Sequence, residues 1–165
     1  MARDARLGHR CYQAELLGTV RYDPRRPGSR ARPWTAVVEL PGDFARLARN
    51  DFERRHGVRL DEPEFGFHVT VFSGAHELTP SMERSWGSFE GARARVLLTG
   101  ELFWKGRCVW ANAHCAERDM MRMVAGLDDA DPELWGHATV GCFPPGRELP
   151  RFLDYRDLPD WGFRP

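Results

Sequence analysis

The same order of predicted elements, a strand, a helix and a second strand, occurs twice in this chain and limits the folds open to it. The first occurrence runs from Trp34 to Ser73 and the second from Val109 to Phe143. β-Branched and aromatic residues mark the strands, and apolar residues at helical spacing mark the helices. Because 165 residues suit a single hydrophobic core, the repeated order predicts one α/β domain built from two similar lobes.

The boundaries of these elements follow from capping and turn residues. Asp43 can cap a helix that ends at Gly57, and Lys105 with Gly106 separates two apolar stretches at the spacing of a β-hairpin. Residues 21–33 combine prolines, a glycine and arginines, and they predict a basic loop that sustains no sheet ladder. Strands are predicted at residues 34–40, 65–73, 93–104, 107–114 and 135–143, and a second helix at 117–127. We expect one domain over residues 1–165, with lobe one at about 34–73, lobe two at about 93–143, a basic N-terminal arm and an aromatic C-terminal tail without regular structure.

Charge and apolar content exclude several classes of partner. The 24 basic residues balance 24 acidic ones, so the chain has no overall positive field to hold long nucleic acid or a membrane surface. No stretch approaches the roughly 18 apolar residues of a membrane helix, and the charged segment from Met1 to His9 lacks the apolar run of a secretory signal. We therefore expect a cytoplasmic protein that acts on a small ligand.

A His-x-Thr motif lies at the same place in both predicted lobes. His68 and Thr70 stand in the first closing strand, and His137 and Thr139 stand in the second. Because side chains alternate across a strand, the histidine and threonine of each motif share one face and their apolar neighbours take the other. One such histidine is more often a hydrogen-bonded core residue, but two in matching contexts favour a function. Two lobes related by an approximate two-fold axis would bring all four side chains to one cleft.

Two imidazoles and two hydroxyls suit phosphodiester chemistry. An imidazole has an unperturbed pKa of about 6.5, so one ring can accept a proton while the other donates one. Threonine hydroxyls can donate hydrogen bonds to the non-bridging oxygens as charge builds on the phosphorus. The cysteines lack the paired spacing of a zinc site, so we expect reduced thiols, no metal and no cofactor. These cysteines are Cys11, Cys108, Cys115 and Cys142.

With two such motifs the chain resembles the 2H phosphoesterase superfamily over residues 34–143. This superfamily includes RNA ligase-like 2',3'-cyclic phosphodiesterases and phage nucleases that cleave cyclic oligonucleotide immune signals. The resemblance implies a bilobal α/β (α+β) fold, in which two pseudo-symmetric lobes of antiparallel sheet carry helices on the outside and enclose a central cleft. It also implies that His68 and His137 are acid and base, in an order left open, and that Thr70 and Thr139 contact phosphate.

Within the superfamily the sequence is more similar to the anti-CBASS phage nucleases, which linearise cyclic di- and trinucleotides. In the RNA ligase-like branch leucine tends to follow the threonine, whereas Val71 and Val140 follow it here. We therefore expect a metal-independent phosphodiesterase that hydrolyses 3'-5' linkages of cyclic di- or trinucleotides, in the cytoplasm of a bacterium, or of the host cell if the protein is phage-encoded. One alternative is an RNA 2',3'-cyclic phosphodiesterase acting on short RNA ends. Another is a module that sequesters a nucleotide without cleaving it.

Aromatic and basic residues outside the motifs supply weaker candidates. Six tryptophans are many for this length, and bases stack on aromatic faces. Trp104 and Trp110 flank the hairpin and are predicted to pack in the core. If aromatic side chains bind the substrate, we expect them to be those of Tyr12, Trp34 and Trp161. A local positive cluster could steer phosphates, although a solvated loop is the commoner meaning of such a run. Its members are Arg25, Arg26, Arg30 and Arg32.

Overall fold

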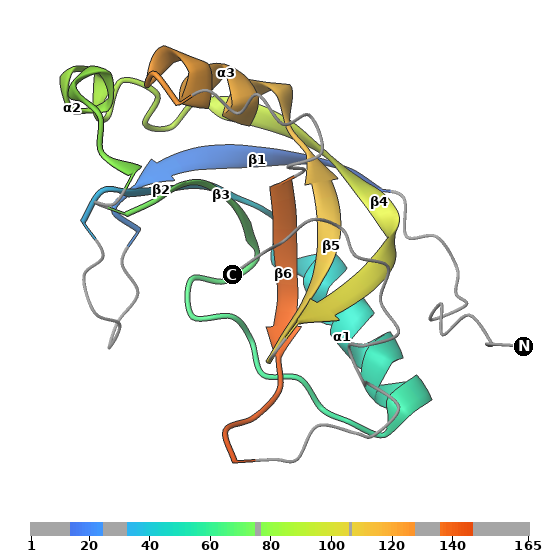
Figure 1. Ribbon diagram of the computed structural model, residues 1–165. Helices are drawn as coiled ribbons and strands as arrows, with labels where there is room; N and C mark the ends of the chain where they lie inside the picture. Colours follow the sequence, from blue (N-terminus) through green and yellow to red (C-terminus); the bar gives the residue numbers. More distant parts are fainter. Residues whose placement is uncertain (1–13, 25–32, 75–76, 106, 128–135, 147–165) are drawn as a thin grey trace, which may run out of the picture.

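A computed structural model of the chain describes residues 14–24, 33–74, 77–105, 107–127 and 136–146 (Figure 1). Six strands and three helices occupy these residues. The predicted order of strand, helix and strand is present twice, from Thr35 to Ser73 and from Cys108 to Cys142. The elements are β1 (Ala14–Tyr22), β2 (Thr35–Glu39), α1 (Gly42–His56), β3 (His68–Ser73), α2 (Pro80–Ser85), β4 (Arg93–Lys105), β5 (Cys108–His114), α3 (Ala116–Val124) and β6 (Gly136–Cys142).

All strand pairs are antiparallel, and they close into one six-stranded barrel in the order β1-β2-β3-β6-β5-β4. The predicted α+β class and the antiparallel sheet are confirmed. The strands of the two predicted lobes belong to one continuous sheet, so the division into lobes around a cleft stays a prediction.

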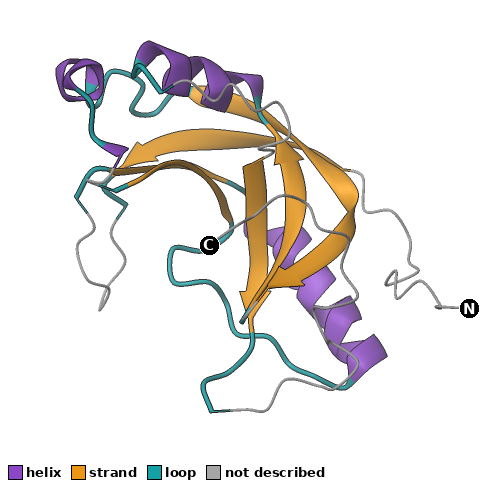
Figure 2. Ribbon diagram, in the orientation of Figure 1, coloured by secondary structure: helices purple, strands orange, loops and turns teal. Residues whose placement is uncertain are grey.

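Three register shifts interrupt the ladders and bend the sheet (Figure 2). Each leaves extra residues on one strand, which increases local twist and curvature and helps a sheet to close. One shift leaves Val71 of β3 without a partner on β2, since Ala36 pairs with Phe72 and Val37 pairs with Thr70. A matching shift leaves Val140 of β6 without a partner on β5. The same position after each His-x-Thr motif is therefore a bulge.

The hydrophobic core lies on one face of the sheet. Every second residue of β5 is buried, namely Val109, Ala111 and Ala113. The apolar residues that alternate with the motif side chains on β3 and β6 are also buried, namely Val69, Val71, Ala138 and Val140. Small residues of α1 and Met121 of α3 pack into the same core as β3 and β6. In Figure 2, α2 and α3 lie together at one end of the sheet and α1 lies at the other. The opposite face of the strands carries mainly polar and partly exposed side chains, together with the buried Val37 of β2.

Two elements were not foreseen. β1 begins at Ala14 and includes Arg21 and Tyr22. The prediction of a basic loop from residue 21 is wrong for these two residues, because Arg21 pairs with Val37 and Tyr22 pairs with Ala36. The ladder forms because alternating Leu16, Gly18 and Val20 face the core. The second element that the sequence does not predict is the short helix α2. Thr79 caps its first turn, because its hydroxyl oxygen accepts a hydrogen bond from the amide of Met82.

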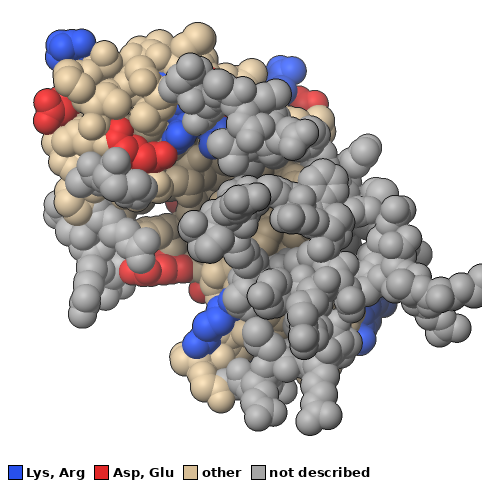
Figure 3. Space-filling model, viewed as in Figure 1, with Lys and Arg blue, Asp and Glu red and all other residues tan. Residues whose placement is uncertain are grey.

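Charges on the described surface are mixed in sign. On the face shown in Figure 3, neither basic nor acidic side chains of the described residues form a continuous patch. No helix within the described residues has the length and apolar character to cross a membrane.

Candidate active site

The two His-x-Thr motifs lie on adjacent strands, and their central residues pair directly. Val69 of β3 is opposite Ala138 of β6 in antiparallel register, and both side chains are 0% exposed on the core face. Extending this register by one residue each way places His68 across from Thr139, and Thr70 across from His137. All four side chains therefore share the face opposite the core.

The spacing on this face follows from sheet geometry. Side chains directly opposite one another have Cβ atoms about 4.5–5.5 Å apart, and diagonal neighbours are about 7–8 Å apart. His68 and His137 are a diagonal pair, as are Thr70 and Thr139, so a group the size of a phosphate fits between the two imidazoles. The electrostatic effect of His68 on the pKa of His137 agrees with this proximity.

His68 is held by the turn that precedes its strand. Its Nδ1 lies 2.8 Å from the carbonyl oxygen of Gly66, and Gly66 adopts a φ of 71°, which favours glycine. Because a carbonyl can only accept, Nδ1 carries a proton and Nε2 is the nitrogen left for chemistry. The ring of Phe65 packs edge-on against it at 6.2 Å. Glu39 stands opposite His68 on β2 and pairs with Arg21 at 3.5 Å.

His137 has a lowered pKa. Desolvation by the surrounding protein is the largest cause of this shift, although part of the side chain reaches solvent. The positive charges of His68 and Arg118 lower the pKa further. Each of these effects disfavours the imidazolium. The neutral form of His137 is thus favoured at neutral pH.

Two residues of β5 also belong to this face. Trp110 is opposite Thr139 and Asn112 is opposite His137, and the Trp110 ring lies 5.8 Å from the His137 ring. The expectation that Trp110 packs in the core is wrong: among the described residues it joins neither hydrophobic cluster. Its alternation with the buried Val109 and Ala111 was the available signal.

Arginines of α1 and α3 donate hydrogen bonds to the bulges that follow the two motifs. A bulged residue leaves its ladder groups unpaired, and here the carbonyl of each bulge accepts from a guanidinium. Arg49 of α1 donates to Val140 at 2.8 Å, and Arg122 of α3 donates to Val71 at 2.6 Å. Each helix therefore holds the motif strand of the other half of the repeat. Sequence reasoning missed these contacts, since a bulge leaves no distinct pattern in the residues.

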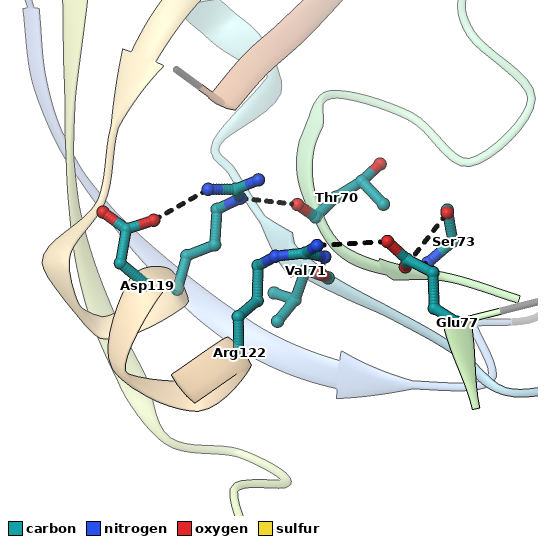
Figure 4. Close-up of polar contacts among 7 residues, drawn as sticks. Thr70, Val71, Ser73, Glu77, Asp119 and Arg122 are labelled. Atoms are coloured by element: carbon teal, nitrogen blue, oxygen red, sulfur yellow. Dashed lines mark hydrogen bonds and ion pairs between the residues drawn. The ribbon is translucent and has the colours of Figure 1, made fainter. Parts of the chain in front are cut away.

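A polar network connects α3 to the first motif (Figure 4). Arg118 donates through Nε to the carbonyl oxygen of Thr70 at 3.0 Å, and it pairs with Asp119 at 2.7 Å. Arg122 also pairs with Glu77 at 3.1 Å, and that carboxylate accepts from the Ser73 amide at 2.7 Å and from its hydroxyl at 3.0 Å. Burial would raise the pKa of Glu77, but the hydrogen bonds from Ser73 and Arg122 outweigh it and the pKa is lowered.

Two glycines of β6 leave room for the side chains of Arg118 and Arg49. A Cβ on Gly136 would lie 3.1 Å from Cγ1 of Val69 and 3.5 Å from Cδ of Arg118. A Cβ on Gly141 would lie 2.8 Å from Cβ of Leu60 and 3.1 Å from Cδ of Arg49. Larger residues at either end of the second motif would push these neighbours away.

Of the remaining predicted site residues, the structure describes only Trp34. Trp34 precedes β2 and packs at 4.8 Å against Trp86, next to the core, so its role in substrate binding stays a prediction. Tyr12 and Trp161 lie outside the described residues. The same is true of the arginine cluster Arg25, Arg26, Arg30 and Arg32.

The described cysteines are free thiols. Cys108 and Cys142 face one another across β5 and β6 with Sγ atoms 3.4 Å apart, and Cys115 is buried, which raises the pKa of its thiol to about 11. Within the described part of the chain, no three His, Cys, Asp or Glu side chains cluster closely enough to hold a metal ion.

Comparison with protein-family models, with curated proteins and with solved structures gave no match for this chain.

Proposed function

We propose that this protein is a phosphodiesterase of the 2H type that cleaves a nucleotide by acid–base chemistry between two histidines. The observation that carries the proposal is the pairing of Val69 with Ala138, which turns two separate His-x-Thr motifs into one four-residue group on one face. A phosphorus atom between the rings would have an imidazole on each side, as in-line displacement requires. The two threonine hydroxyls then lie on the other diagonal, where the non-bridging oxygens are.

The environments of the two rings support different roles. The lowered pKa of His137 favours a neutral ring, which suits a general base. The carbonyl of Gly66 accepts from Nδ1 of His68 and stabilises that ring when it is protonated, which suits a general acid acting through Nε2. We therefore assign the base to His137 and the acid to His68.

For a substrate with a ribose 2'-hydroxyl beside a 3'-5' linkage, the reaction balances in two steps. His137 takes the proton of the 2'-hydroxyl, the 2'-oxygen bonds to phosphorus, the bond to the 5'-oxygen breaks, and His68 protonates that oxygen. The 2',3'-cyclic product is then opened by water, with His68 as base and His137 as acid. The second step returns both rings to their starting protonation states.

Cyclic di- and trinucleotides are the proposed substrate class. The described surface presents charges of both signs, whereas an RNA end is better held by an extended basic groove. Trp110 offers a ring on which a base can stack beside His137, and Asn112 offers an amide that can hydrogen-bond to a base edge.

The test is an incubation of the purified protein, with chelator present, against cyclic di- and trinucleotides and RNA with a 2',3'-cyclic end, with products resolved by chromatography and mass. The proposal predicts linear products from the cyclic oligonucleotides, lost in His68→Ala and His137→Ala but retained in His56→Gln, a control at the end of α1.

The other possible results of this incubation would each argue against the proposal. Cleavage of the RNA ends alone would assign the protein to RNA processing. Tight binding of an unchanged nucleotide after long incubation would identify a sequestering module. Full cleavage by the double variant of His68 and His137 would refute the mechanism.

A further inference from the structure

Arg118 contacts the first motif and lies beside the start of the second. Its Nε donates to the carbonyl oxygen of Thr70 at 3.0 Å, inside the first motif. Its side chain passes Gly136, the residue before the second motif, where a Cβ would lie 3.5 Å from Cδ of the arginine. The side chain is only 13% exposed, so its charge acts at short range with little screening by solvent.

We propose that Arg118 is a positioning residue that couples the two motifs: it fixes the backbone of the first at Thr70 and places its guanidinium charge beside the histidine of the second. Its consequence for catalysis rests on the proposed function, because a neutral His137 is needed there as the base. The arginine itself has no role as an acid, base or nucleophile.

The charged groups around His137 support this role. His68 faces it from β3 and Arg118 from α3, and both lower its pKa. Asp119 pairs with Arg118 at 2.7 Å and offsets part of that charge. On β5 the directly opposite residue is the uncharged Asn112, with His114 two positions further along the strand.

The test is a titration of the histidine rings by NMR, without substrate, in the wild type and four variants. Arg118→Met removes the charge and the donor but keeps the stem, and it should move the His137 midpoint upward. Arg118→Lys keeps the charge and should hold the midpoint lower than Arg118→Met does. Asp119→Asn frees the full charge of Arg118 and should move the midpoint downward; its side chain is 64% exposed, so this variant should fold.

Arg122→Met is the matched control. Arg122 lies on the same helix, is 11% exposed and also donates to a carbonyl of β3, but it is not among the groups that shift His137. Its loss should leave the His137 midpoint unchanged. An equal shift in Arg122→Met and Arg118→Met would overturn the proposal, because it would trace the effect to a loosened helix. Unchanged midpoints in Arg118→Met and Asp119→Asn would overturn it as well.

Failure of this inference and of the proposed function can be distinguished. If the midpoints move as stated while no phosphodiester is cleaved, Arg118 tunes His137 but the activity is wrong. If cleavage occurs and the midpoints do not move, the activity stands and the role of Arg118 is wrong. If the inference and the proposed function are both right, the acidic limb of each variant's pH–rate profile shifts in the same direction as its His137 titration midpoint.

Discussion

Replacing either arginine that donates to a bulge carbonyl should lower the stability of the fold. Arg49→Met removes the donor to Val140, and Arg122→Met removes the donor to Val71. Both changes keep a long apolar stem, so the packing along the helices is preserved. The variants therefore isolate the loss of the guanidinium.

The magnitude follows from what each carbonyl loses. An acceptor left without a partner costs about 1–3 kcal/mol, which is the expected loss of unfolding free energy for Arg49→Met. Arg122→Met also leaves Glu77 without its cation, and with that carboxylate 20% exposed we expect a total of about 2–5 kcal/mol. For a chain of this size each kcal/mol lowers the melting temperature by about 2–4 °C.

Chemical denaturation of the two variants beside Arg46→Met measures these losses. Arg46 pairs with Asp43 on the exposed side of α1, with side chains 66% and 82% exposed, so its loss should cost under about 1 kcal/mol. In a double-mutant cycle, adding Glu77→Gln should recover part of the Arg122→Met loss, because a neutral amide needs no cation. If Arg49→Met and Arg122→Met were as stable as Arg46→Met, the bulges would not depend on the arginines and the reasoning would be refuted.

Three further predictions concern ligand binding and pH. Trp110→Ala should weaken binding of a nucleotide by about 1–3 kcal/mol while Trp110→Phe keeps most of it, and calorimetry with a nucleotide and with ribose phosphate as base-free control checks this; equal losses for both ligands would exclude stacking. Glu77 has a lowered pKa, so it contributes stability above its ordinary pKa that is lost as pH falls through the folded value; acid denaturation of Glu77→Gln should show a flatter limb than the wild type, and identical limbs would contradict the assignment. The rate should rise with pH through the pKa of His137 and fall through that of His68, and a profile with no acidic limb would remove His137 as the base.

The elements that sequence predicts well are those whose local pattern and tertiary environment agree. Strand residues 135–143 and 107–114 alternate or carry β-branched residues, and β6 and β5 occupy nearly these ranges. The helix predicted from the apolar residues at helical spacing becomes α1, but the prediction that Asp43 caps it is wrong. The helix begins at Gly42 without a side-chain cap, and Asp43 lies inside its first turn. β1 was missed because its leucines, glycine and threonine resemble neither a clear strand nor a clear helix, and only pairing with β2 and β4 makes it a strand.

The four motif residues were found in sequence because a period of two places each histidine and its threonine on one face. The direct pairing of Val69 with Ala138 was beyond reach, since register between strands 69 residues apart depends on the whole sheet. Arg118 and Asn112 were missed for the same reason. Their importance comes from neighbours in space, and neither belongs to a pattern along the chain.

The central claim is that His68 and His137 act as one unit on a shared phosphate, and a kinetic cycle tests it most directly. The cleavage rate would be measured for the wild type, His68→Ala, His137→Ala and the double variant, on the substrate found in the panel and with chelator present. The account predicts that each single variant loses about 10²–10⁴-fold in rate and that the double variant loses little more. Losses that multiply in the double variant, or a single variant with wild-type rate, would contradict it.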